Sequence, residues 1–187
     1  ETAPIISIKA TGKNVLITAG ATIAPLDPVR YLTNPSSGLT GYELAKTFLQ
    51  RGDHVTLITG QHSAREIDYL SCLPNSVVLK ARTTSQMKEL VEEHFDKADL
   101  YISSAALSDI EFSSSSSKLK KASLGDSLLI KKAPDVLLEA LKKRKGQVVV
   151  GFAAETNADE VERVARVAGI HDFIVSLPDG YQTKLGT

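Results

Sequence analysis

The sequence predicts an α/β fold in which a Rossmann-like, doubly wound, mostly parallel sheet lies between two layers of helices, making three layers. Short, largely continuous apolar runs, typical of strands buried on both faces, occupy 15–18, 54–59, 76–81, 99–106 and 148–154. Amphipathic segments typical of helices lie between them at 38–50, 85–97 and 135–143. Because strands and helices alternate, neighbouring strands are expected to run parallel.

The first predicted strand leads into a long loop, whose polar residues include Asp27, Arg30 and Asn34. This loop delivers Ser36, Ser37 and Gly38 to the start of the first predicted helix. A helix start offers unpaired N–H groups and a partial positive charge, and Arg30 adds a fixed charge that can grip phosphate. The sequence therefore predicts a phosphate site at the carboxyl edge of the sheet, where such folds bind ligands.

Later elements follow the same logic. Pro134 and Asp135 suit the first turn of the third predicted helix, and 128–131 is expected to form a short extra strand. Five serines at 113–117 cannot form a packed segment, so they predict a flexible loop. Two interpretations of this loop stay open. It is either a disordered surface connection or a mobile flap, since it lies between Asp109 and a lysine cluster at 118–121.

Composition excludes several classes of protein. The 187 residues suit one domain, 42% are hydrophobic, 24% are charged, and the net charge is zero, which does not favour a nucleic-acid or membrane surface. No apolar run approaches the roughly 18–20 residues that span a bilayer. Residues 1–13 lack the pattern of a signal peptide and are expected to be a linker. The single cysteine, Cys72, indicates a reducing, cytoplasmic setting.

Common cofactor motifs are missing. There is neither a P-loop nor a tight GxGxxG turn, and the YxxxK formed by Tyr42 and Lys46 falls on the first helix, where packing is the simpler role for Tyr42. The histidines, at 54, 62, 94 and 171, are scattered, so no protein-built metal site is expected. A Mg²⁺ ion carried in with nucleotide phosphates would need few protein ligands.

The order of the remaining motifs resembles the phosphopantothenate–cysteine ligase family, the phosphopantothenoylcysteine synthetase step of coenzyme A biosynthesis. The matching segments are ITAGATIAPLDPVRYLTNPSSGLTG (17–41), AALSD (105–109), KLKK (118–121), APDVL (133–137) and VVGFAAETN (149–157). The resemblance covers about 14–157 and implies an enzyme that activates 4′-phosphopantothenate with CTP, or with ATP in a eukaryotic branch, and then couples it to cysteine. CTP is the expected nucleotide, with Mg²⁺.

The resemblance also implies roles for individual residues. Lys118 matches a lysine at the nucleotide phosphates, Arg30 an arginine of the active-site loop, and Asn34 an asparagine that contacts the acyl intermediate. Ser36, Ser37 and Gly38 remain the candidates for the substrate phosphate. The residues that match nucleotide contacts are Ser103, Ser104, Ala105, Asp109, Ala133, Pro134, Asp135, Val136 and Phe152.

After Asn157 the motifs end, and 158–187 resembles instead a helical segment of ABC-transporter ATPase domains, without their signature or a Walker A lysine. We expect this segment to be an atypical end of the same domain. The resemblance implies a homodimer and fusion in nature to a flavin-dependent decarboxylase. Two alternatives stay open: a nucleotide-binding module without catalysis, and a nicotinamide-dependent oxidoreductase.

Overall fold

The computed structural model describes residues 12–61, 63, 66–113, 115–120, 127–152, 157–167 and 171–183. The chain divides into two compact units, Glu1–Phe152 and Ala153–Thr187. The first unit holds every residue that the sequence assigns to the candidate site. The predicted linker, apart from residues 12 and 13, lies outside the described residues.

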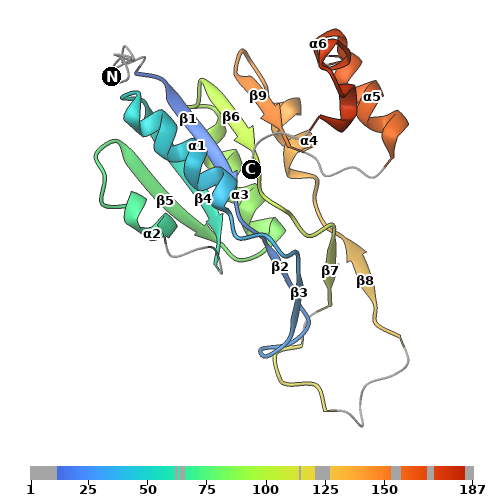
Figure 1. Cartoon of the computed structure of the whole chain (residues 1–187). Helices are drawn as coiled ribbons and strands as arrows, with labels where there is room; N and C mark the ends of the chain where they lie inside the picture. The colour runs from blue at the N-terminus through green and yellow to red at the C-terminus, as the bar shows by residue number, and fades with distance from the viewer. Residues whose placement is uncertain are drawn as a thin grey trace. The chain divides into compact units, whose positions relative to one another are not determined.

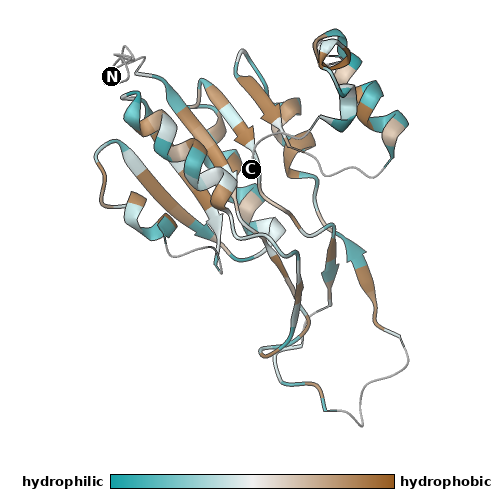
Figure 2. Ribbon diagram, in the orientation of Figure 1, coloured by the Kyte–Doolittle hydropathy of each residue, from teal (hydrophilic) through white to brown (hydrophobic). Residues whose placement is uncertain are grey.

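Five parallel strands form the sheet of the first unit, in the order β5-β4-β1-β6-β9 (Figure 1). They are β1 (Asn14–Ala19), β4 (His54–Gly60), β5 (Ser76–Ala81), β6 (Leu100–Ser103) and β9 (Val148–Gly151). The central β1 pairs with β4 on one side and β6 on the other, with Leu16 opposite Thr56 and Tyr101. Figure 2 shows these strands as mainly hydrophobic segments. The expected burial on both faces holds for β1 and β4, whereas Val77 on β5 and Val148 and Val150 on β9 are 40–56% exposed, because β5 and β9 are the outer strands of the sheet.

Helices cover both faces of this sheet. Val15 and Ile17 of β1 pack with α1 (Leu39–Gln50) and α2 (Glu66–Leu70). Leu16 points to the other face, where the core includes residues of α3 (Thr84–Phe95) and α4 (Val136–Lys142). Successive side chains of β1 therefore serve opposite cores, and the predicted three-layer, doubly wound class is confirmed.

Two antiparallel strand pairs lie beyond the carboxyl edge of the sheet (Figure 1). One joins β2 (Ile23–Pro25) to β3 (Tyr31–Thr33), and the other joins β7 (Ile110–Phe112) to β8 (Ile130–Lys132). The two pairs touch through β2 and β7. We call these four strands, with the connecting residues 26–30, 113, 115–120 and 127–129, the arm.

Most of the predicted helices and strands are present, but their boundaries differ from the prediction. The second predicted helix begins earlier, at Thr84, because Thr83 and Gln86 form a capping box. The expected strand 99–106 is wrong beyond Ser103, and the extra strand lies at Ile130–Lys132 rather than 128–131. The single long loop after β1 is also wrong, since it contains β2 and β3. Residues 153–154 of the last predicted strand lie outside the described residues.

The second unit contains α5 (Ala158–Val167), α6 (His171–Ser176) and the short 3-10 helix η2 (Gly180–Gln182). Within it, α5 contacts α6, and the Nδ1 atom of His171 lies 2.8 Å from the hydroxyl of Tyr181. Among the described residues, no helix has the length and apolar character needed to cross a membrane.

Candidate functional site

The carboxyl edge of the sheet is continued by loops that stay hydrogen-bonded after the strands end. Ser104 donates both its N–H (3.2 Å) and its hydroxyl (2.7 Å) to the carbonyl of Thr18. Ala106 donates to the carbonyl of Gly20 at 2.9 Å, and Phe152 to that of Ser103 at 2.9 Å. The ends of β1, β6 and β9 thus form one backbone platform that carries the predicted Ser103, Ser104 and Phe152.

The start of α1 closes this platform on one side. Gly38 precedes the helix with a φ of 80°, and no side chain caps the helix there. A pocket of about 320 Å³ lies at this point, lined by Ala21, Tyr31, Thr33, Asn34, Pro35, Ser36 and Ser37. Three predicted site residues, Asn34, Ser36 and Ser37, therefore share one pocket next to the start of α1, where the Ser37 hydroxyl accepts the N–H of Leu39 at 3.5 Å.

Asn34 links this pocket to the next segment of the platform. Its side-chain N–H donates to the carbonyl of Leu107 at 2.9 Å, which orients the amide and leaves its oxygen for another donor. Further along, the carbonyl of Asp109 accepts the N–H of Ala133 at 2.9 Å. The two segments matched to nucleotide contacts, 103–109 and 133–136, are joined at this bond.

The residues at the start of α4 differ in what they can offer a ligand. Asp135 accepts the N–H of Leu138 at 2.9 Å as the cap of α4, so its carboxylate already has a structural role. The Val136 side chain is buried in the core, and only its backbone could meet a ligand. Phe152 is 57% exposed and is free to stack on a planar group.

Arg30 and Lys118 lie on the arm. Arg30 donates from Nε (3.0 Å) and Nη2 (2.5 Å) to the Asp27 carboxylate and from Nη2 to the Leu119 carbonyl at 2.9 Å. This guanidinium holds the pKa of Asp27 well below its usual range, reinforced by backbone N–H donors and opposed by burial. Lys118, next to Leu119, is exposed.

The predicted residues therefore fall into two groups. The edge group comprises Asn34, Ser36, Ser37, Gly38, Ser103, Ser104, Ala105, Asp109, Ala133, Pro134, Asp135, Val136 and Phe152. The arm group comprises Arg30 and Lys118. The three-residue strands β2 and β3 separate the arm loop from the edge by roughly 10 Å. Lys121 and residues 153–156 lie outside the described residues.

Asp27 had no assigned role in the sequence analysis, although the order Asp-Pro-Val-Arg signals it. An aspartate before proline commonly accepts N–H groups from its own turn. Here the Asp27 carboxylate accepts the N–H groups of Val29 (2.9 Å) and Arg30 (2.8 Å). A second unassigned polar contact, at 2.9 Å between the hydroxyls of Thr22 and Thr84, is buried beneath the platform.

The YxxxK residues, which the oxidoreductase alternative would use, make contacts of their own in the fold. Tyr42 packs against the core, and the Lys46 ammonium lies 5.7 Å from its ring centroid and 3.5 Å from Glu43. Among the described residues, no group of three or more His, Cys, Asp or Glu side chains could hold a metal ion. His62 lies outside those residues.

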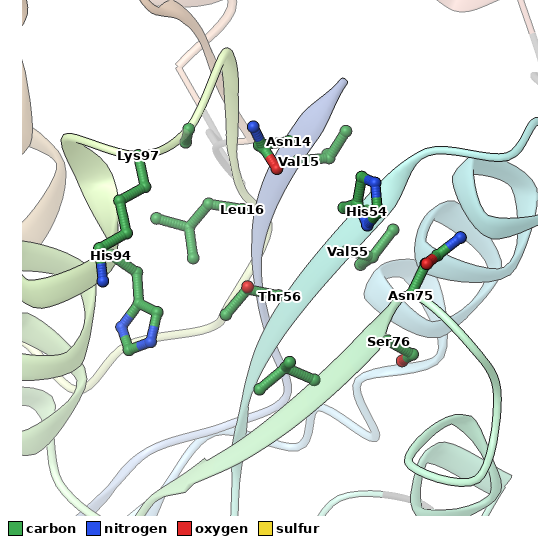
Figure 3. A pocket seen from close by; sticks show the side chains of 12 residues that line it. Asn14, Val15, Leu16, His54, Val55, Thr56, Asn75, Ser76, His94 and Lys97 are labelled. Atoms are coloured by element: carbon green, nitrogen blue, oxygen red, sulfur yellow. The ribbon is translucent and has the colours of Figure 1, made fainter. Parts of the chain in front are cut away.

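Two larger pockets, of about 350 and 690 Å³, lie at the opposite, amino edge of the sheet. Figure 3 shows the first of them, with His54, His94 and Lys97 among its lining side chains. The Nδ1 atom of His94 lies 2.9 Å from the carbonyl of Leu90. Neither pocket is lined by a predicted site residue, and α/β sheets bind ligands at the carboxyl edge, so we place the candidate site there.

Comparisons with known proteins agree with this architecture. The family model described as DNA/pantothenate metabolism flavoprotein C-terminal domain matches residues 10–175, which extends past Asn157. The coenzyme A biosynthesis bifunctional protein CoaBC of Bacillus subtilis is 38% identical over 156 residues, covering 83% of this chain and 37% of the relative. Its counterpart from Escherichia coli K12 is 40% identical over 171 residues, covering 86% and 40%. The chain thus spans about two fifths of the length of these relatives.

Solved structures share the fold. The crystal structure of the C-terminal domain of CoaBC has a TM-score of 0.69 at 28% identity, covering 85% of this chain and 74% of that one. A Cab2 mutant in complex with phosphopantothenate-cysteine has a TM-score of 0.66 at 19% identity, covering 84% and 68%. At 19% identity, the similarity to the Cab2 structure is evidence for the fold alone. By its family match and its curated relatives, this chain belongs to the DNA/pantothenate metabolism flavoprotein C-terminal domain family.

Proposed function

We propose that this chain is a phosphopantothenate–cysteine ligase, which forms 4′-phosphopantothenoyl-cysteine from 4′-phosphopantothenate, cysteine and a nucleoside triphosphate in coenzyme A biosynthesis. The observation that carries the proposal is its family membership, with relatives named for coenzyme A biosynthesis, together with the edge group on one backbone platform. The activity concerns the part of those relatives that this chain spans.

The pocket at the start of α1 suits the phosphate of 4′-phosphopantothenate. The hydroxyls of Ser36 and Ser37 and the N–H groups of Ser37 and Gly38 can donate to it, whereas the Ser36 N–H already donates to the Asn34 carbonyl at 2.8 Å. The helix start adds a favourable field for an anion. Asn34, held by the Leu107 carbonyl, reaches the same pocket with an amide oxygen that neither titrates nor repels an anion strongly. In this proposal its amide orients the acyl intermediate.

The nucleotide occupies the rest of the platform. Ala105, Asp109 and the segment 133–136 offer backbone groups and small side chains that can follow the outline of a base and sugar. Ser103 is 7% exposed and Ser104 donates both its N–H and its hydroxyl to Thr18, so these two serines shape the platform under the nucleotide. Phe152 supplies the one exposed aromatic face in this group. We expect CTP rather than ATP, following the bacterial motifs.

The proposed reaction has two steps. First, the carboxylate of 4′-phosphopantothenate attacks the α-phosphorus of the nucleotide, which forms an acyl-nucleotide and releases pyrophosphate. Second, the amino group of cysteine attacks the acyl carbon, loses a proton and displaces the nucleoside monophosphate, leaving an amide. The first step brings an anion against a triphosphate, so the positive charges of Lys118 and Arg30 lower its barrier.

Mg²⁺ fits the proposal as an ion that enters with the nucleotide. Bound to the triphosphate, it would neutralise charge and polarise the phosphorus under attack. Such an ion needs few protein ligands, and the exposed carboxylate of Asp109 on the platform could be one of them.

The assembly is part of the same proposal. Several apolar side chains of the arm are exposed: Val29, Leu32, Leu129 and Ile130 range from 51% to 73%. A second copy would cover such a surface, so we propose a homodimer, with fusion in nature to a flavin-dependent decarboxylase. The exposed free thiol of Cys72 supports a reducing, cytoplasmic location.

The test is pyrophosphate release in the presence of 4′-phosphopantothenate and Mg²⁺, with CTP or ATP and with or without cysteine. The proposal predicts a release limited to about one equivalent without cysteine and continuous turnover with it, faster with CTP. Saturable CTP binding without any release, from a cooperatively folded sample, would favour the non-catalytic nucleotide-binding module. Enhanced NADPH fluorescence would instead favour the oxidoreductase.

A further inference from the structure

The Asp27 carboxylate has no part in the chemistry proposed so far, yet it is one of the most buried charged groups among the described residues. The residue is 2% exposed and its side chain is inaccessible to solvent. Burying a carboxylate is unfavourable unless it is paired and hydrogen-bonded. Asp27 lies on the arm, away from the core of the sheet, so its hydrogen-bond partners must account for its burial.

One oxygen of this carboxylate shapes its own turn. Oδ1 accepts the N–H groups of Val29 at 2.9 Å and Arg30 at 2.8 Å. The carbonyl of Arg30 in turn accepts the N–H groups of Leu26 (2.9 Å) and Asp27 (3.2 Å). The loop between β2 and β3 is therefore closed on itself and fixes where the Arg30 side chain begins.

The other oxygen reaches a distant segment. Oδ2 accepts Nε and Nη2 of Arg30 and also the N–H of Leu119 at 3.2 Å, while Nη2 of Arg30 donates to the carbonyl of Leu119 at 2.9 Å. The Leu119 peptide is thus held at both its donor and its acceptor. Ser115 adds a bond from its N–H to the carbonyl of Leu26 at 3.1 Å.

This arrangement restricts Arg30 and Lys118 together. The Nε–Nη2 edge of the guanidinium is occupied by Asp27, whereas Nη1 makes no hydrogen bond to the described residues and is directed by the same pairing. Lys118 precedes the clamped Leu119 by one residue, so its Cα position is fixed while its side chain stays exposed. The two cations of the arm group are thus linked through one carboxylate, Arg30 directly and Lys118 through its neighbour Leu119.

We propose that Asp27 is the positioning residue of the arm group: it orients the Arg30 guanidinium and clamps Leu119, so that Arg30 and Lys118 meet the triphosphate as a preorganised pair. Its catalytic consequence rests on the proposed ligase function; the clamp itself does not. Preorganised charge acts on the transition state without reorganisation at the moment of reaction. Loss of the clamp should therefore lower kcat more than it raises KM for the nucleotide.

The test compares Asp27→Asn with Asp53→Asn in the full chain. Asp53 is a matched control, because it is 1% exposed and accepts a backbone N–H, that of Lys13 at 3.0 Å, at the opposite edge of the sheet. Asp27→Asn should reduce kcat for pyrophosphate release about 100-fold, whereas Asp53→Asn, per folded molecule, should keep it within about threefold. A loss of kcat in Asp27→Asn no larger than in Asp53→Asn would overturn the proposal.

A double-mutant cycle separates positioning from a merely structural role. If Asp27 acts through Arg30 and Lys118, then Asp27→Asn in a background that carries both Arg30→Gln and Lys118→Gln should cost no more than about threefold beyond that background alone. Independent losses that multiply would overturn the positioning role even if Asp27→Asn and the background are each slow.

Limited trypsin digestion tests the clamp without relying on the reaction. Cleavage after Lys118 should be at least about tenfold faster in Asp27→Asn than in the wild type, while cleavage at Lys142 on α4 is unchanged, because only the arm opens. Equal rates after Lys118 would overturn the clamp. If the wild type releases no pyrophosphate but the cleavage result holds, the ligase function fails and the clamp stands.

Discussion

The sheet and the arm of this chain are stabilised in different ways. In the sheet, β1 and β4 bury continuous apolar side chains, such as Ile17 and Leu57 at 0% exposure. In the arm, three-residue strands carry exposed apolar side chains, and hydrogen bonds around the buried Asp27 hold the loops together. Closely packed apolar side chains make the sheet sensitive to changes in side-chain volume, but they do not interact with the charge of a ligand. A hydrogen-bonded carboxylate instead fixes the position of the cations that it contacts. The difference fits the proposal in which the sheet supplies stability and the arm presents charge to the reaction.

The largest expected effect lies in the sheet. Leu57→Ala removes a fully buried side chain from β4 and should lower the free energy of unfolding by about 2–5 kcal/mol. Turnover per folded molecule should stay unchanged. Urea denaturation followed by circular dichroism measures the free energy of unfolding. Val29→Ala is the control, because Val29 is 59% exposed on the arm and its truncation should change stability by no more than about 0.5 kcal/mol. Equal losses in both variants would contradict the division of roles.

A substitution on the arm should have the opposite effect, lowering activity without changing stability. Lys118→Gln should reduce kcat/KM for the nucleotide about 100-fold, because it removes the charge that the proposal places at the phosphates, while the melting temperature stays the same. Lys142→Gln is the control: its side chain is 59% exposed and pairs with Glu139 on α4, outside the candidate site. Activity within about tenfold of wild type, roughly 1.4 kcal/mol of barrier, would rule out the phosphate role.

Gly38 tests the junction between the two regions. Its φ of 80° disfavours any side chain, and an added Cβ would lie 2.9 Å from the Gly20 nitrogen. Gly38→Ala should cost about 1–3 kcal/mol of stability and raise KM for 4′-phosphopantothenate, since the start of α1 must shift. Gly146→Ala, where an added Cβ meets nothing within 4 Å, should change neither quantity. Thermal unfolding and steady-state kinetics provide both measurements.

The smallest expected effect concerns Asn34. Asn34→Asp removes the donor to the Leu107 carbonyl and, in the proposed mechanism, places a negative charge beside the acyl intermediate. The cysteine-dependent step should slow about tenfold, with little change in CTP affinity. Rapid-quench kinetics and CTP titration distinguish the two. An equal loss of CTP affinity would instead assign Asn34 a structural role in the loop.

The sequence predicts the sheet better than it predicts the arm. The strands of the sheet could be found because buried parallel strands are continuous apolar runs, such as 54–59. The strands β2, β3 and β7 are too short for any periodicity, so only their tertiary partners define them. The helix cap at Thr83 was signalled by Gln86, but the boundary was assigned one residue late.

The candidate site shows the same limit. The motifs could indicate Asn34, Arg30 and Lys118, and they could place Asn34 at the carboxyl edge. They could not show that Arg30 is engaged by Asp27 or that Leu119, 92 residues away, completes this clamp, because that bond joins segments far apart in the chain. The burial of Val136 was equally hidden, since one apolar residue at a helix start can face either way.

The central claim, that an acyl-nucleotide links the two steps, can be tested by oxygen tracing. With 4′-phosphopantothenate labelled with ¹⁸O in its carboxylate, the ligase mechanism transfers one labelled oxygen to the nucleoside monophosphate when cysteine displaces it. Mass spectrometry of the CMP formed in the presence of CTP, Mg²⁺ and cysteine should therefore show a single ¹⁸O atom per molecule. Product amide formed together with unlabelled CMP would contradict the account.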